Sequence, residues 1–463
     1  MTISVRILII VCGGMLSISG LVPDSFGQEG RNGGRLFDAI DSNRDDRITP
    51  DELADDALFR MLDQNRDGEI VQVESRSAFL AMKAVERRQI TRKLAVLVQS
   101  SQPAIDKQLR TADQSTWQEK LNEIGERAVS LQDVAGGSLR VVIDRKIVFD
   151  RGFGTFGKEL DRPWHTNSPV ALASITKSVT ATLVALLVDQ GCFQFDDPIS
   201  NYLPEYATLQ INGQPIRSPT IAECLSHTSG FPGGTMTRLP ADSPIRKANQ
   251  REVARLIATQ GLVRKPGTRF AYTFRGYAII AAVIEEKLDK RFADVLADQL
   301  LAPLKMDRTT FEPDFETVLK MPIYADRLAG RDPEQAKQQM TRLRSLQPKF
   351  VNAAGGLVST ADDMQRFLQL HLDRGEVEGK LFIRPETLQR LYQVAPACED
   401  YGLGFKIHRY GDRRSIGHGG ATGTGAYFDP LSKRLLIAFT QSRKAGSSAL
   451  VAPAQKAVFA GTD

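Results

Sequence analysis

Apolar and polar positions follow two different periods along the chain, and together they predict strands, then helices, then strands again. Residues 137–143 and 146–149 are rich in β-branched and apolar side chains, and Asp144-Arg145 between them predicts a hairpin turn. Residues 173–188 form a long apolar run followed by Gly191, typical of a buried helix with a glycine after its last turn. Residues 426–430 again predict a strand. This order predicts an α/β (α+β) fold with an antiparallel sheet flanked by helices and a helical subdomain.

The first 27 residues have the pattern of a signal peptide. Arg6 precedes an apolar stretch over residues 7–22, and Ser25-Phe26-Gly27 supplies small residues for cleavage. A membrane anchor is the alternative, but several glycines and serines dilute the apolar stretch. Cys12 would suit a lipoprotein, although Val11 before it is unfavourable. The segment therefore predicts an exported protein, either periplasmic or secreted.

Two segments of twelve residues, 41–52 and 63–74, share a spacing of oxygen-bearing side chains. Calcium prefers six to eight oxygen ligands, and alternating Asp and Asn with a final bidentate Glu provides them. Position 6 is Gly68 in the second loop, which allows a sharp turn, and Asp46 in the first. Position 7 supplies a backbone carbonyl oxygen. The candidate ligands, in loop order, are Asp41, Asn43, Asp45, Arg47 and Glu52, and then Asp63, Asn65, Asp67, Glu69 and Glu74.

These two loops resemble an EF-hand pair, a small all-α module that we place at residues 33–80. Ile48 and Ile70 occupy position 8, where paired loops bridge. The loops start 22 residues apart, which is closer to the compact repeats of dockerin modules than to a standard EF-hand pair. The resemblance implies bound Ca²⁺, as a static clip rather than a sensor that opens. The alternative is a pair of acidic loops closed by Asx turns.

Composition and charge exclude some functions. The 463 residues can hold two or three domains. The chain carries 60 basic and 55 acidic residues and has no long basic block, so nucleic acid is not an expected partner. Cys192, Cys224 and Cys398 remain after the signal segment, and their number and spacing suggest buried thiols rather than a disulfide framework or a metal site. Residues 81–118 are predicted to be a charged helical connector, and residues 119–460 a single large domain.

Ser174 and Lys177 are the first candidates for chemistry. Residues three apart lie on one helix face, so the hydroxyl and the amine are expected one turn apart. A lysine at the mouth of a buried helix loses hydration, which lowers its pKa and suits a proton acceptor beside a nucleophile. The spacing alone also fits an ordinary serine at a helix start. Further motifs follow in order at residues 225–230, 266–277, 354–364 and 417–423, and in the third of these Ser359 and Asp362 are placed as a capping box.

Taken together, these motifs resemble the serine β-lactamase and penicillin-binding protein superfamily, on the class C side that includes D-alanyl-D-alanine carboxypeptidases and esterases. The resemblance covers roughly residues 120–460 and implies a β-lactamase/transpeptidase-like fold. It implies Ser174 as nucleophile, Lys177 as its proton partner, Tyr272 as general base and His418 as the residue of the third motif that faces the substrate. The backbone N–H groups of Ser174 and Ala421 would form the oxyanion hole. No cofactor is implied for catalysis.

The implied substrates are small esters, amides or D-Ala-D-Ala-type peptides. The partner would therefore be a small-molecule or peptidoglycan-derived acyl substrate, and an association with the cell envelope would follow. The pKa of a free tyrosine is near ~10, and a cationic Lys177 is expected to lower that of Tyr272.

One residue departs from the pattern. Where relatives have the Asn of Tyr-x-Asn, this chain has Phe274, which cannot hydrogen-bond to the amide of a substrate. We expect this change to disfavour β-lactams and to offer apolar surface to small esters. It also leaves open a non-catalytic penicillin-binding-like sensor. The EF-hand pair separately leaves open a calcium-dependent docking protein.

Other residues near the motifs have structural interpretations. His227 is expected to fix a loop near the site, and Tyr277 to belong to the core or the pocket wall. The glycine run at residues 420–425 lacks the context of a nucleotide-binding loop. His371 and His408 form no metal pattern.

Overall fold

The computed structural model describes residues 114–131, 134–157, 160–240, 242–322, 334–335, 338, 349–411, 413–442 and 446–460, with two short strands at residues 47–48 and 70–71. The chain divides into two compact units, Met1–Ser115 and Thr116–Asp463. The predicted signal segment lies outside the described residues, as do most of the loop ligands and nearly all of the connector.

The first unit contains a two-stranded antiparallel pair. Strand β1 (Arg47–Ile48) pairs with β2 (Ile70–Val71), so that Ile48 lies opposite Ile70. Each of the two similar loops therefore contributes its eighth residue to the same small ladder. The remaining residues of both loops lie outside the described part of the chain.

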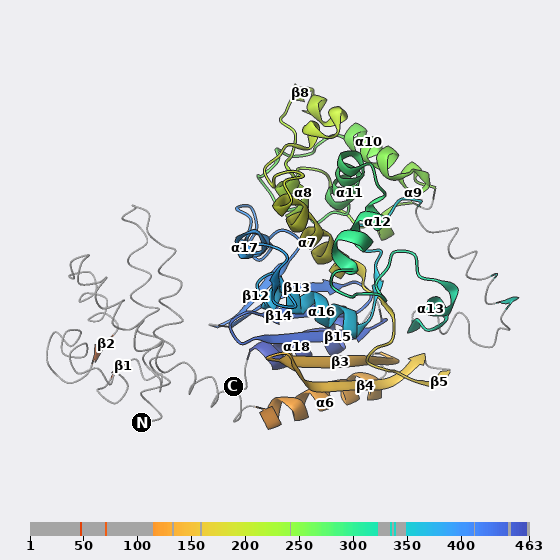
Figure 1. Cartoon of the computed structure of the whole chain (residues 1–463), viewed down its shortest axis with the longest axis vertical. Helices are drawn as coiled ribbons and strands as arrows, with labels where there is room; N and C mark the ends of the chain where they lie inside the picture. Colours follow the sequence, from red (N-terminus) through yellow and green to blue (C-terminus); the bar gives the residue numbers. More distant parts are fainter. Residues whose placement is uncertain are drawn as a thin grey trace. The chain divides into compact units, whose positions relative to one another are not determined.

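The second unit is built on a seven-stranded antiparallel sheet (Figure 1). Its strands, in spatial order, are β12 (Lys406–Tyr410), β13 (Arg413–Gly420), β14 (Thr424–Asp429), β15 (Arg434–Thr440), β3 (Gly136–Ile143), β4 (Lys146–Gly157) and β5 (Leu160–Pro163). The predicted hairpin is β3–β4, and its turn residues Asp144 and Arg145 have φ of 48° and 66°. Two consecutive left-handed residues match the twist of the flanking strands. The C-terminal strand β15 pairs with β3 and joins the two ends of this unit.

Helices cover both faces of the sheet, because successive side chains of a strand point to opposite faces. On one face, Val141 and Leu436 pack with Trp117 of α6 and Phe459 of α18. On the other face, Val142 and Leu435 belong to the larger core that includes α7 and α16. The helices are α6 (Gln114–Ser130), α7 (Thr176–Asp189), α8 (Ile221–Leu225), α9 (Pro244–Lys247), α10 (Gln250–Gln260), α11 (Arg275–Leu288), α12 (Phe292–Leu296), α13 (Phe315–Leu319), α16 (Ala361–Leu372), α17 (Pro385–Tyr392) and α18 (Ala452–Phe459).

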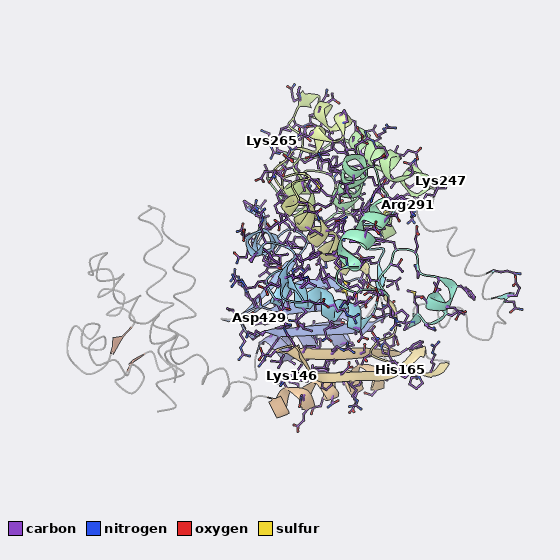
Figure 2. All side chains as sticks on the ribbon, viewed as in Figure 1. Lys146, His165, Lys247, Lys265, Arg291 and Asp429 are labelled. Carbon is purple, nitrogen blue, oxygen red and sulfur yellow. The ribbon has the colours of Figure 1, made fainter. Side chains whose placement is uncertain are left out.

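The predicted helical subdomain is present between the two groups of strands. Helices α8 to α12 gather at the end of the unit away from β3 and β4, as Figure 1 shows. In Figure 2, Lys247 and Lys265 mark this helical part, whereas Lys146 and Asp429 lie beside the strands. Thr220 and Asn249 begin α8 and α10 with capping boxes. The α+β arrangement expected from the sequence is therefore confirmed.

The helix start predicted at Ser359 is wrong by one residue. Ser359 belongs to the two-residue strand β9 (Val358–Ser359), which pairs with β6 (Val170–Ala171). Because Ser359 is held in that ladder, Thr360 is the N-cap of α16 and accepts a hydrogen bond from the backbone N–H of Asp363 at 3.4 Å. Asp362 instead receives hydrogen bonds from Arg140 and Asn167.

The three cysteines of this unit are free thiols. Cys224 is buried, and Cys192 and Cys398 are partly buried. None of the helices in the described ranges is both long enough and apolar enough to cross a membrane.

Candidate active site

Ser174 lies on a tight turn that leads into a helix buried along almost all of its length. The turn is a 3-10 helix, η1 (Ala173–Ile175), and α7 begins directly after it at Thr176. Ala173 has a left-handed φ of 48°, which is strained for a residue with a side chain. Helix α7 is buried from Thr176 to Val188, and Gly191 follows its C-cap with φ of 74°, as predicted. Ser174 itself stays partly exposed at the mouth of this helix.

Lys177 is buried beside Ser174. Its Nζ lies 3.3 Å from Ser174 Oγ and 2.6 Å from the carbonyl oxygen of Ala354. The rings of Tyr272 and Tyr277 lie 4.7 Å and 5.5 Å from the same nitrogen. Burial lowers the pKa of Lys177 to about 7. The sequence prediction of an amine one turn from the hydroxyl, with a lowered pKa, is therefore supported by the geometry.

Tyr272 completes the group but not with the predicted ionisation. Burial raises the pKa of Tyr272 to about 12, although the nearby hydroxyl of Ser174 acts to lower it. The expectation that Lys177 would lower this pKa is wrong, because the loss of hydration outweighs the other contributions. At neutral pH Tyr272 therefore keeps its proton, and the amine of Lys177 is the better acceptor for the proton of Ser174.

The loop at residues 352–357 holds the start of α7. Leu172 donates its backbone N–H to the carbonyl oxygen of Leu357, and Leu357 N–H donates to Thr176 Oγ1 at 3.2 Å. Thr180 Oγ1 donates to the carbonyl oxygen of Ala353. The Ala354 carbonyl that binds Lys177 comes from this loop. Its role was missed in the sequence, since a backbone acceptor leaves no side-chain signal.

The turn between β13 and β14 lies against the residues before Ser174. Thr422 Oγ1 donates to the carbonyl oxygen of Ala171 at 2.7 Å, and Thr424 Oγ1 donates to that of Leu172 at 2.9 Å. A Cβ atom at Gly420 would lie 2.3 Å from the Leu172 oxygen, so only glycine fits there. These contacts hold the backbone of Ala421 at the side of the Ser174 turn. That is where the second N–H of the expected oxyanion hole is needed.

His418 is buried on β13, with its ring 6.2 Å from that of Tyr272. Its Nε2 lies 3.1 Å from Tyr401 Oη, and its Nδ1 lies 2.6 Å from the carbonyl oxygen of Gly419. Burial lowers the pKa of His418 to about 3, with Lys177 adding to the effect. The sequence expectation was a residue facing the substrate. In the structure both ring nitrogens are directed to protein groups.

His227 has the structural contacts expected for it. Its Nδ1 accepts a hydrogen bond from the backbone N–H of Thr273 at 3.2 Å and so holds the segment that carries Tyr272. Its ring lies 4.3 Å from the ring of Tyr272 and 5.0 Å from that of Tyr401. The backbone of His227 is left-handed, with φ of 61°.

Phe274 faces the core rather than the substrate. Its side chain is only 3 % exposed, and Arg275 lies over its ring at 5.1 Å. The expectation that Phe274 offers apolar surface to an ester is therefore wrong. The other expectation, that Phe274 cannot hydrogen-bond to the amide of a substrate, is unchanged, since Phe274 has no side-chain amide. Tyr277 is fully buried, as expected for a core residue, and its hydroxyl donates to the carbonyl oxygen of Leu225 at 2.8 Å.

The structure also bears on the metal and nucleotide interpretations. Within the described ranges, no three or more His, Cys, Asp or Glu side chains are placed to hold a metal ion. Most of the proposed calcium ligands lie outside those ranges. The glycine run at residues 420–425 connects two antiparallel strands and leads into no helix, so it is not a nucleotide-binding loop.

Comparison with known proteins agrees with this geometry. The family model described as Beta-lactamase matches residues 121–460. Penicillin-binding protein 4 of Amycolatopsis lactamdurans is 27% identical over 323 residues, which cover 67% of this chain and 80% of that protein. The D-alanyl-D-alanine-carboxypeptidase/endopeptidase AmpH of Escherichia coli (strain K12) is 29% identical over 252 residues, covering 51% of this chain and 58% of that protein. This chain thus spans little more than half the length of AmpH.

A solved structure described as a family VIII carboxylesterase has the same fold. It superposes with a TM-score of 0.58 at 17% identity and covers 74% of this chain and 98% of its own.

Proposed function

The chain belongs to the beta-lactamase family, and from this membership we propose that it is a serine hydrolase that forms an acyl-enzyme on Ser174. The observation that carries the proposal is the buried amine of Lys177, 3.3 Å from Ser174 Oγ and with its pKa lowered to about 7. A neutral amine at that place can take the proton of the serine as its oxygen attacks an acyl carbon.

The remaining steps follow from the groups beside this pair. The uncharged amine donates one N–H to the Ala354 carbonyl and turns its lone pair to Ser174. In the proposed mechanism, the tetrahedral oxyanion accepts hydrogen bonds from the backbone N–H groups of Ser174 and Ala421. Tyr272, which keeps its proton at neutral pH, donates it to the departing alkoxide or amine and regains one from Lys177. Water then releases the acyl group by the same route in reverse.

We propose small esters as the preferred substrates, ahead of small amides, D-Ala-D-Ala-type peptides and β-lactams. The support is Phe274, since this position brings no side-chain amide to pair with the polar groups of an amide substrate. Leaving such a group unpaired costs roughly 1–3 kcal/mol. The names of the relatives, a carboxypeptidase/endopeptidase and a carboxylesterase, indicate the same range of acyl substrates.

The test compares hydrolysis of a p-nitrophenyl ester, a chromogenic cephalosporin and a D-Ala-D-Ala peptide. The unmodified protein is expected to have its highest kcat/KM for the ester, and Ser174→Ala is expected to lose hydrolysis while keeping its fold. Ser178→Ala is the matched control, because Ser178 lies one turn further along α7 and its hydroxyl donates to the Gly404 carbonyl rather than to the catalytic group. Hydrolysis that survives in Ser174→Ala would contradict the proposal. Binding of the cephalosporin without turnover of any substrate would favour a penicillin-binding-like sensor instead.

We further propose that residues 33–80 form a calcium-binding EF-hand pair and that residues 1–27 direct export to the periplasm or beyond the cell. The pairing of Ile48 with Ile70 supports the first proposal, since the eighth residues of two paired calcium loops bridge in this way. A calcium-dependent docking role for the pair is the alternative to a structural clip.

A further inference from the structure

A chain of buried hydrogen bonds lies beside the catalytic group and takes no part in the steps above. Its members are Tyr277 of α11, Tyr401 just before β12, and His418 of β13, each of them at most 2 % exposed. The phenols of Tyr277 and Tyr401 lie close enough for each to influence the pKa of the other. Tyr401 Oη lies 3.1 Å from His418 Nε2. Three elements distant in the sequence are thus joined through polar groups where no water reaches them.

Both ends of this chain are carbonyl oxygens, which can only accept hydrogen bonds. At one end Tyr277 Oη must donate to Leu225, at 2.8 Å. At the other end His418 Nδ1 must donate to Gly419, at 2.6 Å. A neutral His418 therefore carries its proton on Nδ1, and its Nε2 has a free lone pair. The hydroxyl of Tyr401 is the group that donates to it.

A neutral His418 leaves one hydrogen atom on each of the three side chains. Tyr277 donates its own to Leu225, Tyr401 to His418 Nε2, and His418 Nδ1 to Gly419. No hydrogen atom then remains for a bond between the two tyrosines. With a proton on Nε2, His418 would donate to Tyr401, and the hydroxyl of Tyr401 would be free to donate to Tyr277.

We propose that Tyr401, supported by Tyr277, is a positioning residue that engages Nε2 of His418 and supplies the acceptor when this nitrogen takes up a proton. The activity part of this inference rests on the proposed function, but the hydrogen-bond part does not. With Nε2 bound to Tyr401, the imidazole does not compete with Lys177 for the proton of Ser174.

The other groups around His418 work against its protonation. Lys177 of α7 and both Lys406 and His408 of β12 lower its pKa, in addition to burial. The ring of Tyr272 lies 6.2 Å from the imidazole, and His227 is close enough to His418 for the two histidines to interact electrostatically. The Gly419 carbonyl favours the cation slightly. Tyr401 is the side chain that can accept from the protonated ring, and such charge-assisted hydrogen bonds are stronger than neutral ones.

The test observes the imidazole nitrogens directly. The chain has five histidines, so a protein labelled with ¹⁵N-histidine gives a spectrum that a His418→Gln variant can assign. We expect His418 to carry its proton on Nδ1, with an Nε2 signal displaced by a hydrogen bond. In Tyr401→Phe this signal should move toward that of a free lone pair, and protonation of His418 should begin at a lower pH than in the unmodified protein.

Two further variants make the result specific. Tyr206→Phe is the matched control, since Tyr206 is also fully buried and donates to a backbone carbonyl, that of Ala254 at 2.8 Å. It should leave the His418 signals unchanged. Tyr277→Phe keeps the Tyr401 contact but removes the second acceptor, so it should lower the pH of protonation with little effect on the neutral Nε2 signal. It also provides the test should Tyr401→Phe fail to fold.

Activity gives a second readout. Tyr401→Phe should lower kcat by between about 10- and 100-fold with little change in KM, because the released imidazole would compete with Lys177 for the proton of Ser174. An Nε2–H tautomer in the unmodified protein would overturn the inference. So would His418 signals and a titration that Tyr401→Phe leaves unchanged. If no variant and no substrate shows activity, the proposed function fails while the NMR result still decides the inference.

Discussion

Lys177 is a buried lysine with unusual surroundings for an amine. It contacts one hydroxyl, one carbonyl oxygen and two aromatic rings, and no carboxylate among the described residues pairs with it. An uncompensated charge is costly there, which is why the neutral form is favoured. The same burial raises the pKa of Tyr272. A single physical cause therefore divides the roles of proton acceptor and proton donor between the two side chains.

We predict that ester hydrolysis falls as the pH is lowered below neutrality. Because the pKa of Lys177 is lowered to about 7, the neutral amine gains population as the pH rises through that value, and kcat/KM for an ester should rise with it. Lys177→Arg, which stays charged, should lose between about 10²- and 10⁴-fold in rate. Lys406→Arg is the control, since that lysine lies on β12 outside the catalytic group and should keep most of its activity. A profile that is flat across neutral pH would contradict this assignment.

For individual residues, the sequence predicted which side chains meet in the site better than it predicted their pKa values. The spacing of Ser174 and Lys177 fixes their separation along the first turn of α7, so their contact could be expected. The raised pKa of Tyr272 could not, because it depends on how loops from other parts of the chain bury the phenol. Tyr401 gave no recognised signal, since its importance depends on a hydrogen bond to a strand 17 residues further on.

At the scale of elements, the position of Ser174 depends on three segments that converge on the start of α7. The loop at residues 352–357, the β13–β14 turn and strand β9 each bond to residues 170–180. The one-residue error at the start of α16 has the same origin. A capping pattern is read from residues adjacent in sequence. It cannot show that Ser359 pairs with the distant strand β6 and is therefore not the N-cap.

Arg140 links the sheet to α16. Its buried guanidinium bonds to Asp150 at 2.9 Å and to Asp362 near the helix start. Arg140→Met should lower the free energy of unfolding by roughly 1–3 kcal/mol, because two carboxylates lose a charged hydrogen-bond donor. The expected loss of stability is moderate because the side chains of Asp150 and Asp362 are 30 % and 44 % exposed to solvent.

Denaturant unfolding measures this effect. The control is Arg291→Met, which breaks an ion pair whose two side chains are both more than half exposed and should cost no more than about 1 kcal/mol. Equal losses in the two variants would show that Arg140 has no special role in joining the sheet to α16.

At the scale of the whole molecule, the order of strands and helices could be predicted, but the strand neighbours could not. The β3–β4 hairpin was predicted because its partners are adjacent in sequence. The pairing of β15 with β3 joins residues almost 300 positions apart, and an apolar pattern does not specify which strands meet. The β-lactamase/transpeptidase-like fold was instead predicted from the resemblance of the motifs to penicillin-binding proteins.

The first unit gives a separate prediction. Calorimetric titration should detect two calcium ions per chain, with tighter binding by the loop that contains Gly68. Calcium at about 100 times its Kd should stabilise the folded state by roughly 2.7 kcal/mol, so the holo protein should melt at a higher temperature than the chelated protein.

Two substitutions that each remove one negative charge test which side chains bind the calcium. Glu74→Gln removes the expected bidentate ligand and should weaken the second site. Glu69→Gln should not, because position 7 binds through its backbone carbonyl. The absence of calcium uptake would support two Asx-turn loops instead. A large loss of ester hydrolysis on chelation would favour regulation over a structural clip.

The central claim is a covalent acyl-enzyme on Ser174, and intact-protein mass spectrometry after reaction with a fluorophosphonate tests it most directly. We predict one added phosphonyl group per chain, located on the peptide that contains Ser174, and no addition to Ser174→Ala. Pre-incubation with the preferred ester should slow the labelling. Labelling of Ser174→Ala to the same extent, or of a different residue in the unmodified protein, would contradict the account.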